Sequence, residues 1–264
     1  MDNQRLIYRL LNVMNRLWRI LAASFGFALF GFGGLVVLST LWFNVLRLFV
    51  WQRKTRNIIA QYSISCSFKF FLWVVKKLGV LDYQFEGLEL LEQDQGCLIV
   101  ANHPSLLDVV FLASVMPRCN CMVKESLLKN IFVSGVIKAA GYIPNTEANK
   151  MRSYCQQTLA EQGRILIFPE GTRSIPNQPL KLHRGAANIA LRCHADIRII
   201  HIECHPAFLI KNQKWYQAPL SKPVFNISVG EKIEIARFMN ENMTISARRL
   251  TQYMAQKLYN TKTV

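Results

Sequence analysis

The longest uncharged stretch of this chain runs for 27 residues, from Ile20 to Leu46. A helix needs about 20 apolar residues to cross the hydrocarbon core of a bilayer, so this stretch predicts a membrane-embedded helical segment. It is too long for the core of a cleaved signal peptide, and no small-residue cleavage site leads into a polar start. Its four glycines weaken a continuous helix. A tilted single span and a hairpin that returns to the same face therefore both remain open.

Positive charge surrounds this stretch on both sides. Residues 3–81 contain no acidic residue, although the chain carries a net charge of +16 and is 51% hydrophobic. This combination favours a membrane surface as the partner and disfavours a nucleic acid. Similar positive flanks cannot assign a side by the positive-inside rule, but they favour a hairpin whose two ends meet anionic headgroups. The basic residues concerned are Arg5, Arg9, Arg16, Arg19, Arg47, Arg53, Lys54, Arg56, Lys69, Lys76 and Lys77.

A second apolar stretch, residues 58–80, is interrupted by Lys69. It fits an interfacial helix with Phe70, Phe71 and Trp73 at the acyl boundary, or equally a helix that packs on the following domain. We therefore expect residues 1–80 to form a membrane-associated helical segment. The seven cysteines show no disulfide spacing, which predicts reduced thiols and a membrane protein whose bulk faces the cytoplasm.

The pattern changes near Asp82. Short apolar runs typical of buried strands alternate with helical stretches, and this alternation predicts an α/β domain over residues 81–264 with a mostly parallel sheet flanked by helices. The expected strands are 97–102, 120–125, 164–170, 197–203 and 224–230. The expected helices are 105–116, 126–140, 148–162 and 244–259.

Two polar clusters directly follow expected strands: NHPSLLD at 102–108 and PEGTRS at 169–174. Functional groups in open parallel sheets lie beyond the carboxyl ends of the strands. The sequence therefore predicts that these two clusters share one site.

His103 and Asp108 lie five residues apart, which on one helix would separate their side chains by about 140°. Pro104 disfavours a helical His103 and itself favours the first helical position. We therefore expect His103 just before the helix and Asp108 in its second turn, pointing back. The carboxylate would bind one ring nitrogen and leave the other as a base. Taken alone, without the second cluster, the pattern around His103 favours a helix-capping histidine.

A serine nucleophile is disfavoured because the G-x-S-x-G pattern is absent. Ser105 is expected to satisfy backbone amides. In the second cluster, Gly171 permits close approach of the backbone to a ligand, and Arg173 suits a phosphate. Glu170 suits a hydroxyl or orients Arg173. The alternative for this cluster is an ion-paired turn.

Together these residues resemble the glycerolipid (lysophospholipid) acyltransferase family, in its 1-acyl-glycerol-3-phosphate acyltransferase-like form. Asn102, His103 and Asp108 match its motif N-H-x-x-x-x-D, and residues 168–174 match F-P-E-G-T-R-S in full. The resemblance implies transfer of a fatty acyl group from acyl-CoA or acyl-carrier protein to a hydroxyl of a lysophospholipid or related membrane lipid. It implies a general base, His103, oriented by Asp108, and no metal or bound cofactor. It also implies an acceptor-binding set consisting of Glu170, Gly171, Thr172 and Arg173.

The chain departs from the family at two places. Pro144 and Asn145 stand where the family's second motif commonly has a basic residue for the acceptor phosphate, and Pro206 is displaced from the usual position of a late-strand proline. Three other basic residues could substitute: Lys124, Lys150 and Arg152. A specialised lipid acceptor, or an inactive lipid-binding protein with this fold, therefore remains open.

Two neighbouring cysteine–histidine pairs are not expected to bind zinc. Residues that adjoin on a strand point to opposite faces, and the pairs lack the spacing with which two ligands grip one ion. The pairs are Cys193 with His194 and Cys204 with His205, with His201 between them.

Overall fold

The computed structural model describes residues 2–145, 148–175, 178 and 181–259. Seven strands form one sheet in the order β1-β7-β6-β2-β5-β3-β4. All neighbouring strands are parallel except β6 and β7. The expected α/β fold with a mostly parallel sheet is therefore confirmed. The strands are β1 (Asp82–Glu86), β2 (Leu98–Ala101), β3 (Cys119–Lys124), β4 (Ile143–Asn145), β5 (Arg164–Ile167), β6 (Ile197–His205) and β7 (Val224–Ile233).

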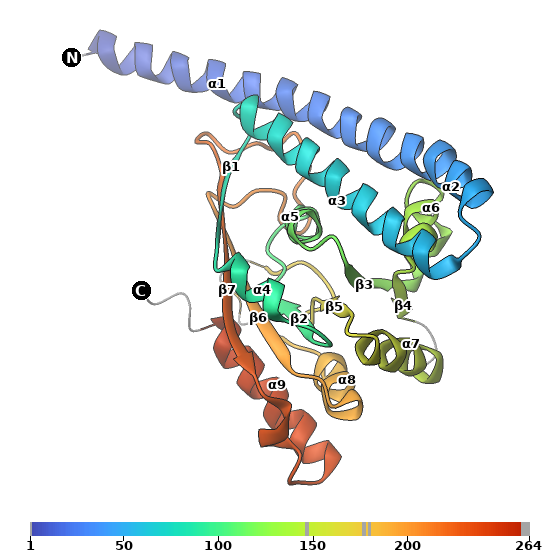
Figure 1. The fold of residues 1–264 in the computed structure, drawn as a ribbon. Coiled ribbons are helices and arrows are strands. Elements are labelled where there is room, and N and C mark those ends of the chain that lie inside the picture. Colours follow the sequence, from blue (N-terminus) through green and yellow to red (C-terminus); the bar gives the residue numbers. More distant parts are fainter. Residues whose placement is uncertain (1, 146–147, 176–177, 179–180, 260–264) are drawn as a thin grey trace.

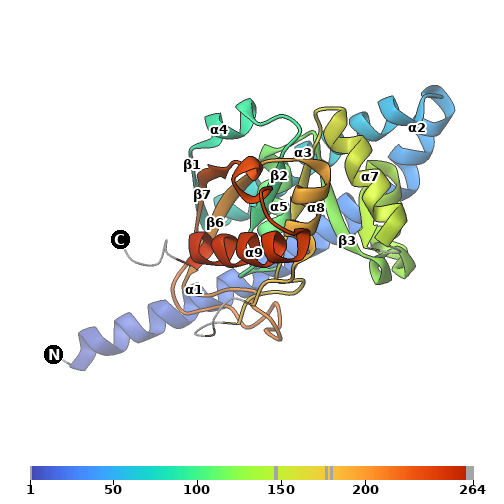
Figure 2. The ribbon, with the colours of Figure 1, turned by 90° about the horizontal axis from the view of Figure 1, so that it is seen from below.

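Helices cover both faces of the sheet (Figures 1 and 2). One layer contains α1 (Asp2–Ala28), α3 (Arg53–Lys77), α5 (Asp108–Val115) and α6 (Ile131–Ala140), and the other contains α7 (Ala148–Ala160), α8 (Gly185–Cys193) and α9 (Met243–Tyr259). A short helix, α4 (Leu88–Gln93), follows β1, and 3-10 turns occupy η2 (Glu125–Lys129) and η3 (Ile235–Phe238).

Strand β2 lies at the centre of the sheet and is buried on both faces. Its alternate residues enter two cores, because successive side chains of a strand point to opposite faces. Ile99 and Ala101 join the core beneath α1, α3 and α5, whereas Leu98 and Val100 join the core beneath α7, α8 and α9. This burial holds the carboxyl end of β2 rigidly, and the first polar cluster begins there.

The uncharged stretch is helical throughout, but it contains no hairpin. It continues from α1 through a π-helix, η1 (Leu29–Trp42), into α2 (Phe43–Phe49). Three of the four weakening glycines, at 31, 33 and 34, lie within η1, where the helix changes its hydrogen-bond pattern instead of ending. The fourth, Gly26, lies within α1. The chain reverses only at residues 50–52, and α3 then runs back beside α1 (Figure 1). Among the described helices, α3 is the one long and apolar enough to cross a membrane by length and composition.

For residues 58–80, the expected packing on the following domain is confirmed for one face of α3, and the interfacial helix stays a prediction for the other face. Phe71 and Leu72 are buried in the core shared with the sheet, whereas Phe70 and Trp73 are more than half exposed. Helix α3 is thus a packing helix on one face, and its other face presents aromatic side chains outward. Phe71 does not lie at the outer surface as the interfacial interpretation required.

The expected strands and helices are present, with two additional strands, two additional helices (α4 and α8) and two late helix starts. The expected helix 126–140 begins as the 3-10 helix η2 and becomes α-helical only at Ile131. Strands β1 and β4 have only five and three residues and carry little periodicity. Helix α5 begins at Asp108 instead of Pro104, since residues 102–107 form a loop and turn. The cysteines are all free thiols, as expected.

Candidate active site

Asn102 fixes the point at which the chain leaves strand β2. The parallel pairing of β2 with β6 ends at Ala101 and Ile200. The Asn102 amide then continues the ladder: its Nδ2 donates to the carbonyl of Ile202 and its Oδ1 accepts from the N–H of Ile202, both at 2.8 Å. An amide satisfies both groups because it carries a donor and an acceptor. The following residue, His103, is therefore set at a defined position beyond the sheet.

The ring of His103 is held from two sides. Its Nδ1 lies 2.7 Å from Oδ2 of Asp108, and its ring stacks on Phe168 with centroids 4.3 Å apart. The side chain of His103 is 17% exposed, whereas that of Asp108 is fully buried. With Nδ1–H donated to the carboxylate, Nε2 is the nitrogen that remains to accept a proton.

Asp108 points back toward His103 as expected, although it does so from the first residue of α5. The same Oδ2 accepts the backbone N–H of Ser105 at 2.7 Å, and the Ser105 hydroxyl accepts the N–H of Leu107 at 3.3 Å. The carboxylate thus closes the turn that precedes the helix. The predicted role of Ser105 as a partner of a backbone amide is confirmed.

Burial changes the acidity of Asp108. Removal from water raises the pKa of its carboxyl to about 6, against the lowering effect of the hydrogen bonds from His103 and Ser105. No described residue donates to Oδ1, which is buried. An ionised Asp108 therefore depends strongly on the two donors to Oδ2.

The two polar clusters are joined by direct hydrogen bonds. Oε1 of Glu170 accepts the backbone N–H of His103 and the hydroxyl of Ser174, both at 2.9 Å. The N–H of Ser174 donates to the carbonyl of His103 at 2.7 Å. Glu170 is buried. Its carboxylate therefore binds the protein's own backbone and a serine hydroxyl, and it orients the His103 loop instead of Arg173.

Arg173 binds a third loop, which connects β6 to β7. Its Nη1 donates to the carbonyls of Leu209 and Ile210 at 2.9 and 3.0 Å. The N–H of Leu106 donates to the same Leu209 carbonyl at 3.1 Å. The alternative of an ion-paired turn between Glu170 and Arg173 is wrong, because each side chain is engaged elsewhere.

The same β6–β7 loop is held from its other side by helix α1. Nε of Arg16 donates to the carbonyl of Ala218 at 3.1 Å, and Nη2 of Arg19 donates to the carbonyls of Pro219 and Leu220. These two arginines thus bind the loop. Arg19 is buried by this contact, whereas Arg16 remains exposed and still contributes its charge to the surface.

Gly171 and Thr172 of the second cluster lie open to solvent. Gly171 has φ +65°, and a Cβ atom there would lie 3.3 Å from Cδ2 of His183. Thr172 and His183 are exposed. Of the six predicted site residues, His103, Asp108 and Glu170 are joined by direct hydrogen bonds, and Arg173 holds the neighbouring β6–β7 loop. Gly171 and Thr172 form an exposed rim beside them.

The region of the second family motif lies at the same edge of the sheet. Lys124 and Asn145 are paired at the carboxyl ends of β3 and β4. Lys124 is exposed, and its strand pairs with β5, which leads into the second cluster. Arg152 lies exposed on α7. Residues 146–147 and the side chain of Lys150 are outside the described part of the structure.

No group of three or more histidine, cysteine, aspartate or glutamate side chains within the described ranges is arranged to hold a metal ion.

Comparison with known proteins finds similarity to acyltransferases. Residues 82–205 match the family model described as Acyltransferase. The chain is 26% identical to mouse 1-acyl-sn-glycerol-3-phosphate acyltransferase alpha over 151 residues, which cover 54% of this chain and 53% of that protein. It is 24% identical to the Pseudomonas aeruginosa 1-acyl-sn-glycerol-3-phosphate acyltransferase over 192 residues, covering 70% of each. The chain thus spans about half the length of the mammalian relatives it matches.

A solved structure shows the same fold. The 1-acyl-sn-glycerophosphate (LPA) acyltransferase PlsC from Thermotoga maritima superposes with a TM-score of 0.66 at 17% identity, over 94% of this chain and 97% of that one. The match to the acyltransferase family model covers residues 82–205, the part of the chain that carries both polar clusters. The relatives named above are 1-acyl-sn-glycerol-3-phosphate acyltransferases, so the comparisons support the resemblance that the sequence motifs predicted.

Three contributors to the site were not predicted from the residues themselves: Phe168, Ser174 and the β6–β7 loop. Phe168 and Ser174 stand at the two ends of the FPEGTRS run, so the length of that motif was the available signal. The loop contacts carry no such signal, because they join residues far apart in the chain.

Proposed function

We propose that this protein transfers a fatty acyl group from an acyl thioester, acyl-CoA or acyl-carrier protein, to a hydroxyl of a lysophospholipid or related lipid. The observation that carries the proposal is the His103–Asp108 pair: a buried carboxylate 2.7 Å from Nδ1 of a partly exposed imidazole. This arrangement fixes the tautomer in which Nε2 is the base.

In the proposed reaction, Nε2 of His103 takes the proton of the acceptor hydroxyl as its oxygen attacks the thioester carbonyl. The tetrahedral intermediate then collapses, the carbon–sulfur bond breaks, and the thiolate leaves with the proton from the imidazolium. Asp108 stabilises the imidazolium between these two steps. A thioester is already activated, so this chemistry needs a base and an oriented acceptor but no resident metal or cofactor.

The acceptor is assigned to the rim formed by Gly171 and Thr172, with Lys124 as the cation for its phosphate. Lys124 is exposed at the carboxyl end of β3, beside Asn145, where the family commonly has its basic residue. An ammonium is a suitable point charge for a phosphate. Glu170 and Arg173 support this site by holding the loops around His103.

Membrane lipids are proposed as partners because exposed apolar side chains concentrate on the N-terminal helices. Large hydrophobic residues of α1, such as Leu17, Leu21 and Phe25, are more than half exposed. An apolar surface of this extent is typical of a membrane or protein interface. The catalytic domain would then lie on the cytoplasmic face, where free thiols persist.

The test is acyl transfer by the purified full chain and by His103→Ala, with acyl-CoA and acyl-carrier protein as donors and a panel of lysophospholipids. We expect the variant to lose about two to four orders of magnitude in kcat when it is assayed under conditions in which circular dichroism shows it to be folded. Equal rates for variant and parent would exclude the mechanism. Absence of transfer by the parent to any lipid would instead favour the inactive lipid-binding alternative.

Lys124→Gln tests the acceptor assignment separately. We expect a higher KM for phosphate-bearing acceptors with little change in kcat, because a distant phosphate contact contributes to binding in the ground state and transition state alike. An unchanged KM would favour a specialised acceptor without that phosphate.

A further inference from the structure

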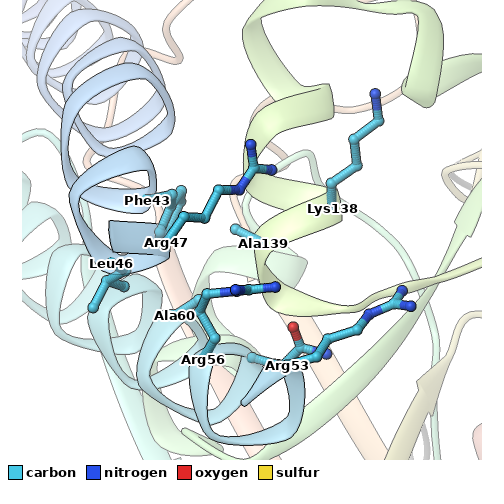
Figure 3. A pocket seen from close by; sticks show the side chains of 9 residues that line it. Phe43, Leu46, Arg47, Arg53, Arg56, Ala60, Lys138 and Ala139 are labelled. Carbon is cyan, nitrogen blue, oxygen red and sulfur yellow. The ribbon is translucent and has the colours of Figure 1, made fainter. Parts of the chain in front are cut away.

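A cavity of about 330 Å³ lies where α2, α3 and α6 meet, away from the loops that surround His103 (Figure 3). Four of its lining side chains are cationic, and none of the lining residues is acidic. The guanidinium groups of Arg47 and Arg56 point toward α6, as the close-up shows. The full lining is Phe43, Leu46, Arg47, Arg53, Arg56, Asn57, Ala60, Lys138 and Ala139.

Two of the four cationic side chains of this cavity, Arg47 and Arg56, form hydrogen bonds within the protein. Arg47 donates to the side chain of Asn44 at 3.4 Å, and Arg56 donates to the carbonyl of Val50 at 3.2 Å. Among the described residues, no carboxylate forms an ion pair with either guanidinium. The neighbouring Lys54 differs, since it forms an ion pair with Glu161 at 2.8 Å. Concentrated positive charge of this kind is destabilising by itself and favours an anionic occupant.

The floor of the cavity is apolar and packed. Phe43, Leu46 and Ala60 belong to a small hydrophobic core together with Val136 and Ala140. This core fixes α2, α3 and α6 relative to one another. The four cationic residues are therefore carried by rigid helices, and a defined site requires such support.

The turn beside the cavity carries the most exposed large apolar side chains of the chain's described part. Leu48 is 73% exposed, Phe49 is 78% exposed and Trp51 is 89% exposed. They lie between Arg47 and Arg53 in the sequence. Apolar side chains at a tip, with cations immediately beside them, match the boundary between acyl chains and headgroups in a bilayer.

We propose that this cavity binds the phosphate of an anionic phospholipid headgroup, while Leu48, Phe49 and Trp51 insert among the acyl chains. The site is separate from acyl transfer, so it stands or falls independently of the proposed function. It would orient the helical layer on the membrane by a specific lipid contact in addition to its apolar surface.

The test measures equilibrium binding of the purified full chain to phosphatidylcholine vesicles with and without phosphatidylglycerol. The double variant Arg53→Gln/Lys138→Gln removes two pocket charges that have no described side-chain partner. The matched control Lys69→Gln/Lys77→Gln removes two exposed charges that lie on α3 outside the cavity. A charge-preserving variant, Arg53→Lys/Lys138→Arg, reports any loss caused by misfolding.

We expect the pocket variant to lose about tenfold or more in affinity for the anionic vesicles, and the control to lose about threefold or less. On pure phosphatidylcholine, parent and pocket variant should agree within about twofold, and the charge-preserving variant should follow the parent on both. If the pocket variant and the control variant lose the same affinity for anionic vesicles, the attraction comes from general surface charge, and the proposed headgroup site is wrong.

A titration of the detergent-solubilised chain with inorganic phosphate distinguishes a lipid from a free anion. Weak or absent saturation, with strong vesicle binding, supports the headgroup. Tight phosphate binding that Arg53→Gln/Lys138→Gln abolishes, with vesicle binding unchanged, would overturn the lipid assignment.

Discussion

The backbone N–H of His103 donates to Oε1 of Glu170 over 2.9 Å, so a side chain from the loop after β5 fixes the residue that follows β2. Because β2 and β5 are neighbouring parallel strands, their carboxyl ends already lie at one edge. The Glu170 carboxylate converts that proximity into a fixed position for the imidazole.

Glu170→Ala should therefore lower kcat by about tenfold or more while changing the acceptor KM little, because the imidazole would lose its backbone anchor. Glu170→Gln retains an oxygen that can accept from His103 and should keep most of the activity. Steady-state kinetics on both variants make this comparison. A large rise in acceptor KM with unchanged kcat would instead make Glu170 a ligand of the acceptor.

Acyl transfer should depend on the ionisation of Asp108. Burial raises the pKa of this carboxyl to about 6. The carboxylate that orients His103 is thus present above that pH, and kcat/KM should fall by up to about tenfold per pH unit below it. The measurement is a pH–rate profile on protein shown to remain folded. The Asp108→Asn variant should be much slower, and its pH–rate profile should lack this fall at low pH. If the variant shows the same fall as the parent, the ionisation belongs to another group.

Arg173→Ala should destabilise the protein, because the guanidinium holds the carbonyls of Leu209 and Ile210. Loss of hydrogen bonds from a charged donor to two carbonyls corresponds to about 1–3 kcal/mol in the free energy of unfolding. Thermal or denaturant unfolding measures this loss. Undiminished stability together with a raised acceptor KM would show that Arg173 acts on the substrate instead.

A buried ion pair at the opposite end of the sheet should govern stability without affecting the chemistry. Nε and Nη2 of Arg198 bind the two carboxylate oxygens of Asp94 at 2.6 and 2.9 Å, and both residues are buried. Asp94→Asn should cost about 3–5 kcal/mol, because it leaves a buried guanidinium without its counter-charge.

The double variant Asp94→Leu/Arg198→Met provides the control for this pair. It should recover part of the stability, since apolar replacement of both partners removes the uncompensated charge. The kcat per folded molecule should match the parent, as Arg198 lies near the start of β6 and His103 lies beyond the opposite edge. A kcat that fell with Asp94→Asn in fully folded protein would contradict this separation.

The meeting of His103, Asp108 and Glu170 could be predicted because each follows or starts an element whose pattern is strong. The polarity breaks at Asn102 and Pro169 mark the same edge of a parallel sheet. The partners of Arg173 could not be predicted in this way. Its contacts depend on the conformation of the β6–β7 loop, and an arginine suited to a phosphate equally suits a pair of carbonyls.

In the N-terminal segment, too, one feature could be predicted from the sequence and another could not. Its helical character followed from the absence of charge, but its path did not. The glycines at 31, 33 and 34 lie within η1, where a change of hydrogen-bond pattern replaces the break that they suggested. The reversal occurs at residues 50–52, and packing of α3 on the sheet determines its direction.

The pairing of β1 with β7 has a consequence for how the protein folds during its synthesis. Asp82 of β1 lies opposite Val224 of β7. Strand β1 therefore cannot pair until the ribosome has added β7, which is 142 residues further along the chain. Contacts of such separation form late, because a long loop must be closed before they are gained. On the ribosome, α1 and α3 are therefore complete while the edge of the sheet is still unpaired, and the last strand synthesised completes the strand order.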